Sequence, residues 1–271
     1  MAIPNDRWWK DHELWIEVFA MLNIAGLTFD IYLAHSVNAF RSRAEFMPLV
    51  FSAVSPVIML GALAQRRRRA IWTALGLFVG WGAILVGLTG VILHLQSHFF
   101  YERTIRSLTY SAPFVAPLAY TGLGFLLVMN HMVNAGTVEW GHWILVFTLG
   151  GYFGNFVLSL ADHAENGFFF PVEWVPVAAS AVAVGFLVVP LIMGVSRRFL
   201  DLCAAILGLE GAVGLWGFLL HANSNLQGPS IHMFDNFIYG AAPLAPLLFP
   251  NLMLLGVIGL WQLRNNLKPV G

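Results

Sequence analysis

The chain has 271 residues, of which 58% are apolar and only 10% are charged, and its formal net charge is zero. Its mean hydropathy is +0.74. A soluble domain of this length could not cover its surface with so few polar groups. Nucleic acid is excluded as a partner, because the basic residues gather at the edges of apolar runs and build no basic face. The composition therefore predicts an integral membrane protein in contact with the lipid bilayer.

Eight apolar runs follow one another along the chain. A helix needs about 20 apolar residues to cross a hydrocarbon core of about 30 Å. The runs are too long and too uniformly apolar for the alternating strands of a membrane barrel. We therefore expect an all-α fold with eight transmembrane helices, at residues 14–34, 46–64, 71–94, 111–130, 142–162, 174–195, 200–221 and 238–262.

The basic residues predict the orientation. If the odd-numbered runs cross outward, ten of the fourteen Lys and Arg residues lie on the inner side: Arg7, Lys10, Arg66, Arg67, Arg68, Arg69, Arg197, Arg198, Arg264 and Lys268. Loops enriched in Lys and Arg remain in the cytoplasm. We therefore expect cytoplasmic N and C termini and a multi-pass protein of a bacterial-type plasma (inner) membrane.

The chain contains an internal repeat. The stretch AHSVNAFRSRAEFMP at 34–48 aligns without a gap with residues 162–176, which matches His35 to His163 and Glu45 to Glu173. Offsets that differ by one residue in either direction match His94 to His221 and Tyr110 to Tyr239. The repeat predicts two tandem four-helix halves, 1–135 and 136–271, related by a pseudo-twofold axis along the membrane normal.

Six repeated polar residues fall at one depth, near the outer membrane face. The histidines end odd-numbered runs, and each glutamate lies three residues before a proline that starts an even-numbered run. Imidazole and carboxylate together suit iron, manganese or zinc. We expect these residues to meet around one centre as a metal site, holding either a single ion or two ions bridged by the glutamates: His35, Glu45, His94, His163, Glu173 and His221.

Further polar residues have candidate roles near this site. Tyr110 and Tyr239 are candidate catalytic residues that could donate hydrogen bonds to a bound oxygen species or substrate. His98, His232 and Asp162 are candidate additions to the metal site. The same residue types also have structural roles, since a glutamate before a helix can cap it and a tyrosine at the membrane edge can anchor it.

Two acids lie deep in apolar runs on the inner side. Intramembrane carboxylates are candidates for functional sites, and we assign Glu17 and Glu210 to a proton path. The inner-side histidines, His12, His131 and His142, are expected to lie at the membrane interface.

The sequence leaves four functions open. The first is a membrane-embedded metalloprotein that uses a metal to act on a lipid-soluble substrate, by redox or hydrolytic chemistry. In the second, the histidines bind haem b in an electron-transfer subunit. The third is a metal-ion or proton transporter. The fourth is a noncatalytic subunit of a respiratory or photosynthetic complex, with periplasmic or membrane partner subunits. Whether the protein is an enzyme is left open.

Overall fold

A computed structural model describes residues 11–267, and within them all regular structure is helical. The predicted all-α class is confirmed. Within residues 11–267, seven helices are long and apolar enough to cross a membrane, counting the single 3₁₀ turns that lead into three of them. The long helices are α1 (His12–Ser36), α2 (Phe46–Ala64), α3 (Arg69–Gln96), α7 (Val138–Glu165), α8 (Trp174–Ile192), α9 (Arg197–Leu226) and α11 (Leu248–Asn266).

The remaining helices are shorter. One apolar helix, α6 (Leu118–Met132), has 15 residues, and the others are α4 (Phe99–Glu102), α5 (Ile105–Thr109) and α10 (Met233–Tyr239). Three 3₁₀ turns precede long helices: η2 (Arg43–Glu45), η3 (Pro171–Glu173) and η4 (Ala245–Leu247).

The predicted runs at 111–130 and 238–262 were wrong at their starts. Residues 111–117 form turns before α6, and residues 240–244 separate α10 from η4 and α11. Prolines explain both differences: Pro113 and Pro117 precede α6, and Pro243 and Pro246 precede α11. Proline lacks the N–H group that a helix interior needs and restrains the preceding residue away from helical geometry.

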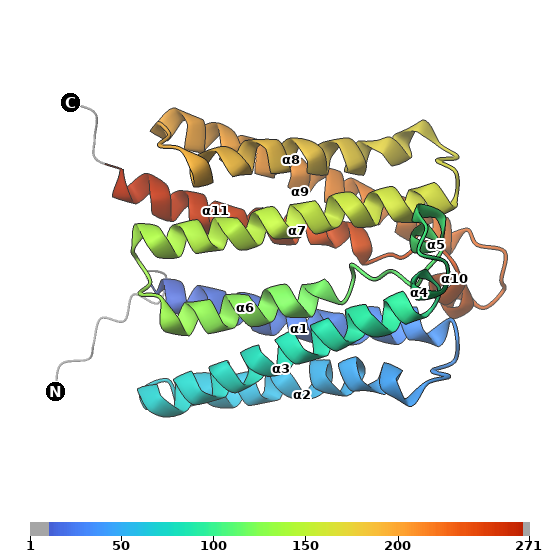
Figure 1. Cartoon of the computed structure of the whole chain (residues 1–271), viewed down its shortest axis with the longest axis horizontal. Coiled ribbons are helices and arrows are strands. Elements are labelled where there is room, and N and C mark those ends of the chain that lie inside the picture. Colours follow the sequence, from blue (N-terminus) through green and yellow to red (C-terminus); the bar gives the residue numbers. More distant parts are fainter. Residues whose placement is uncertain (1–10, 268–271) are drawn as a thin grey trace.

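The helices pack as two sets of four. In the first set, α1 and α3 each contact both α2 and α6; in the second, α7 and α9 each contact both α8 and α11. Figure 1 shows the sets side by side, with all long axes roughly parallel. Helices α6 and α7 contact each other and so join the two sets. Helix α1 meets α11 where the side-chain amides of Asn23 and Asn251 hydrogen-bond to each other.

The bundle has two chemically different ends. We call one the basic end, because it holds the start of α3 at Arg69, the start of α9 at Arg197 and the last turn of α11 at Arg264. The opposite end, where α1, α3, α7 and α9 finish, is the histidine end (Figure 1).

Small residues bring α3 and α6 into close contact. A Cβ atom added to Gly124 would lie 2.5 Å from the carbonyl oxygen of Gly80, so the two backbones touch directly. Apolar side chains gain little from leaving lipid for a neighbouring helix, so close van der Waals contact of this kind holds membrane helices together.

Gly124→Ala should therefore separate α3 from α6. We expect the free energy of unfolding to fall by about 1–3 kcal/mol, as for other overpacked contacts, measured by denaturant unfolding in detergent. Gly122→Ala is the matched control on the same helix, because a Cβ atom there meets no atom within 4 Å. Equal stability of the two variants would contradict the proposed backbone contact.

Candidate functional site

The α1–α2 connection brings His35 to Glu45. After α1 the chain turns through Ala39 and Phe40, whose φ angles of 56° and 51° are left-handed. The backbone N–H of Phe40 donates to the carbonyl of His35 at 3.1 Å, and the turn places His35 Nδ1 3.6 Å from Glu45 Oε2. The reversal is local, so ten residues of sequence suffice to form this pair.

Glu45 also has a structural role. Its Oε1 accepts a hydrogen bond from the backbone N–H of Ser42 at 3.2 Å, and the Ser42 hydroxyl accepts one from Ala44 N–H, which completes a capping box at η2. A capping box satisfies free N–H groups at a helix start. The Glu45 carboxylate therefore holds the hairpin and contacts His35 at the same time.

His94 joins this group from the end of α3. Its ring centroid lies 6.2 Å from that of His35, in an edge-to-face arrangement. Its Nδ1 lies 3.0 Å from the carbonyl oxygen of Pro113, in the turns before α6. A carbonyl oxygen can only accept, so Nδ1 carries the proton and Nε2 keeps a free lone pair. We call His35, Glu45 and His94 the first group.

The second group has the same local geometry. The chain turns through Gly167 and Phe168, with φ angles of 69° and 50°, and the Phe168 N–H donates to the His163 carbonyl at 2.9 Å. His163 Nδ1 lies 3.8 Å from Glu173 Oε2. His221, in the last two turns of α9, lies near enough to His163 for an electrostatic interaction, and its Nδ1 is 2.7 Å from the Ala242 carbonyl oxygen.

The two groups differ at the glutamate. At the position of Ser42 the second group has Phe170, so no side chain caps η3. Glu173 Oε2 is buried and has no hydrogen-bond partner among the described residues. Helix capping therefore does not explain the position of the Glu173 carboxylate beside His163.

The structure brings the six predicted ligands together as two groups of three, not around one centre. Figure 1 shows the α1–α2 and α7–α8 connections at opposite edges of the histidine end. Within residues 11–267, no three His, Cys, Asp or Glu side chains lie close enough as placed to hold a metal ion. A metal ion at either group would therefore require its side chains to rotate toward one point.

The candidate catalytic tyrosines and the candidate additions to the metal site lie at the surface. Tyr110 and Tyr239 are 56% and 68% exposed, at the ends of α5 and α10. His98 and His232 are exposed residues that directly precede α4 and α10. Asp162 is an exposed neighbour of His163 on α7.

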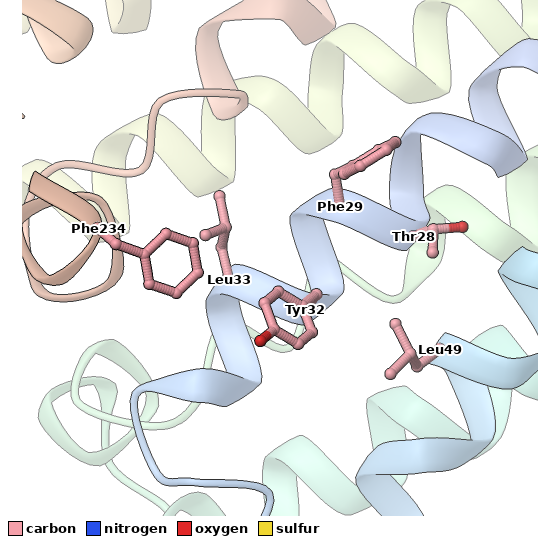
Figure 2. A pocket seen from close by; sticks show the side chains of 6 residues that line it. All are labelled: Thr28, Phe29, Tyr32, Leu33, Leu49 and Phe234. Atoms are coloured by element: carbon pink, nitrogen blue, oxygen red, sulfur yellow. The ribbon is translucent and has the colours of Figure 1, made fainter.

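An apolar groove lies beside the first group. It measures about 410 Å³ and is lined by Thr28, Phe29, Tyr32, Leu33, Leu49 and Phe234. Figure 2 shows Phe234 of α10 facing the last turns of α1. Tyr32 and His35 both lie about 6 Å from the ring of Phe40, at 6.0 and 5.9 Å between centroids. The groove therefore borders the first group through aromatic contacts.

His131 corrects the sequence prediction. Its side chain is fully buried, as is that of Glu17, and Nε2 lies 2.6 Å from Glu17 Oε1. The prediction of an interfacial histidine failed because His131 lies at the end of α6, and only the packing of α6 against α1 and α3 encloses it. Glu210 is also buried, but it lies on α9 in the other set of helices.

Comparisons of the chain with protein-family models, curated proteins and solved structures gave no match. The assignment of function therefore depends on the arrangement of the side chains alone.

The buried Glu17–His131 pair gives a prediction about stability. Glu17→Leu leaves an unpaired histidine in an apolar interior, and His131→Leu leaves an unpaired carboxylate. We expect each single variant to lose about 3–5 kcal/mol of unfolding free energy, whereas the double leucine variant should lie within about 1 kcal/mol of wild type or above it. Chemical unfolding in detergent measures all four proteins. Additive losses in the double variant would contradict a coupled pair.

Proposed function

We propose that the protein is a membrane-embedded metalloprotein with one transition-metal site in each half, at the histidine end. The observation that carries this proposal is the anchoring of His94 and His221, whose Nδ1 atoms lie 3.0 and 2.7 Å from backbone carbonyl oxygens. Metal-binding histidines almost always have the second nitrogen fixed in this way, which orients the first toward the metal.

The donor sets suit a transition metal. Each group offers two imidazoles and one carboxylate, a combination that fits iron, manganese or zinc. His35 and His163 have their Nδ1 atoms near a glutamate, 3.6 and 3.8 Å away, so their Nε2 atoms also remain available. A bound ion would supply Lewis-acid or redox chemistry. The histidines would hold it, and the glutamates would either bind it or orient the imidazoles.

The groove beside the first group supports a lipid-soluble substrate. Every exposed atom that lines it is apolar, and it lies among the last turns of α1, where a molecule could enter from the bilayer. The apolar part of such a substrate would lie in the groove, with its reactive head toward His35. Tyr110 and Tyr239, at the surface, remain candidates for contacts with that head.

Metal analysis of the purified protein tests this proposal. We expect about two ions per chain in wild type, one for each group, by mass spectrometry of protein prepared without chelators. His35→Ala with His94→Ala, and His163→Ala with His221→Ala, should each lose about half. His98→Ala with His232→Ala is the matched control and should keep the metal, because those exposed residues belong to neither group.

Two outcomes would overturn the metal proposal. A folded wild-type protein without stoichiometric metal would reject it. An optical Soret band that disappears in the His35, His94 variant would replace it with the haem b alternative, in which the protein is an electron-transfer subunit.

We further propose that the chain crosses the membrane eight times as two repeated halves, with cytoplasmic termini in a bacterial-type inner membrane. The turns at 111–117 together with α6 would form the fourth crossing, and non-helical backbone there would be buried against protein. The matching turns at Phe40 and Phe168, 128 residues apart, support the repeat. The arginines at the basic end support the orientation.

Cysteine labelling in intact cells tests the orientation. Arg67 and Asn166 are exposed residues in connections at opposite ends of the bundle. Cysteine at 166 should react with a membrane-impermeant maleimide from outside, whereas cysteine at 67 should react only after lysis. The native Cys203 is buried and serves as the background. The reverse pattern would invert the proposed topology.

A further inference from the structure

Among the ion pairs given for the described residues, the pair near the basic end is the one in which both side chains are fully buried. Glu17 comes from α1 and His131 from α6, and both side chains have 0% exposure. The groups at the histidine end, by contrast, are only partly buried, with 20% exposure at His35 and 15% at Glu45. Glu17 and His131 therefore lie in apolar surroundings where a net charge is costly.

Helix α3 forms a cradle for the histidine. A Cβ atom at Gly76 would overlap the His131 imidazole, so only glycine admits the ring at this position. The indole of Trp72, one turn away, meets the imidazole edge to face at 5.0 Å between centroids. Five polar atoms here are buried without a hydrogen bond of ordinary geometry in the described protein: Glu17 Oε1 and Oε2, His131 Nδ1 and Nε2, and Trp72 Nε1.

The second half packs the same region without charge. With the offsets of the proposed repeat, 128 residues after Glu17 and 129 after His131, the matching residues are Leu145 and Leu260. With the offset of 127 that matches His94 to His221, Gly76 corresponds to Cys203. These three residues belong to one apolar cluster of buried side chains. The fold can therefore be built with leucines here, so packing alone does not require the pair.

Charged residues cover the pair on the side of the basic end. Arg69 makes a bidentate ion pair with Glu13, at 2.6 and 2.9 Å, and its guanidinium lies 4.7 Å from the centroid of the Trp72 ring. Arg66 pairs with Asp11 in the same layer. Helix α2 contributes no charged group to this region, since its buried residues are Ser52, Ser55, Met59 and Ala62.

We propose that Glu17 and His131 form a proton-binding site that exchanges one proton with the aqueous phase at the basic end. With one proton the pair is neutral overall, either as Glu⁻ with His⁺ or as neutral acid with neutral imidazole. Release of that proton to water leaves Glu⁻ beside neutral imidazole, and Arg66 and Arg69 place positive charge on that side. Intramembrane Glu and His of this kind serve proton relays. The proposal does not depend on the metal sites.

Infrared spectroscopy across a pH titration tests the site in the purified full-length protein. We expect an infrared band of Glu17 that changes with pH, either the C=O stretch of its protonated carboxyl or a carboxylate stretch altered by the titrating imidazole. Glu17→Gln should abolish that signal, and His131→Gln should move its midpoint by about one pH unit or more. Glu210→Gln is the matched control and should keep the Glu17 signal, because Glu210 is a buried carboxylate on a helix of the other set.

Arginine variants test the access side. Arg69→Gln removes a positive charge that disfavours proton binding, so the midpoint should move to higher pH. Arg264→Gln removes the arginine paired with Asp201 at the same end of the other set and should leave it unchanged. An equal shift in both variants would overturn entry of the proton beside Arg69.

A double leucine variant, Glu17→Leu with His131→Leu, keeps the test informative if the single variants fail to fold. It places leucine at both positions, as the second half does at Leu145 and Leu260. It should fold and take up about one proton fewer than wild type over the same pH range. A wild-type protein whose infrared spectrum shows no pH-dependent band of Glu17, or a double variant with unchanged proton uptake, would overturn the proposal and leave the pair a packing feature.

Discussion

Close packing of α3 on α6, and of α9 on the start of α11, positions the rest of this protein. Gly124 touches the backbone at Gly80, and Gly214 touches the carbonyl of Pro246 in the same way, with 2.5 Å to an added Cβ atom in each case. Lipid chains are as apolar as the helices, so short contacts of this kind, and not exclusion from water, hold the helices together.

These contacts also place the histidines. Along α3, Gly80 and Gly90 pack on Gly124 and Pro117, and His94 follows one turn later beside the carbonyl of Pro113. The second set has the same order: Gly214 and Gly217 pack on Pro246 before His221 reaches the carbonyl of Ala242. The prolines that delay the starts of α6 and α11 leave these carbonyls outside a continuous helical ladder, where they can accept from imidazole, although the carbonyl of Pro113 also accepts from the Ala116 N–H.

The two sets of helices share one arrangement but differ in the polar side chains that they hold. At the histidine end both keep a His–Glu–His group, although only Glu45 is committed to a helix cap. Near the basic end they diverge, with Glu17 and His131 in one half and an apolar cluster around Leu145 and Leu260 in the other. A buried polar group in lipid is costly unless it is satisfied, and the proposed proton site is argued from this difference.

The sequence by itself determined the helical class, the long apolar helices and the pairing of His35 with Glu45 and His163 with Glu173. Each of these depends on hydropathy or on turns closed within about ten residues, which local interactions decide. The sequence also determines where α6 and α11 start, through Pro113, Pro117, Pro243 and Pro246. Hydropathy alone did not indicate these starts, because the residues around the prolines are apolar.

Only the tertiary structure decided that the six candidate ligands form two groups and that His131 is buried against Glu17. Both outcomes depend on residues far apart in the chain, as in the 114 positions that separate Glu17 from His131. A histidine at a helix end faces water or the interior according to which helices surround it. Hydropathy along the chain does not indicate which helices those are.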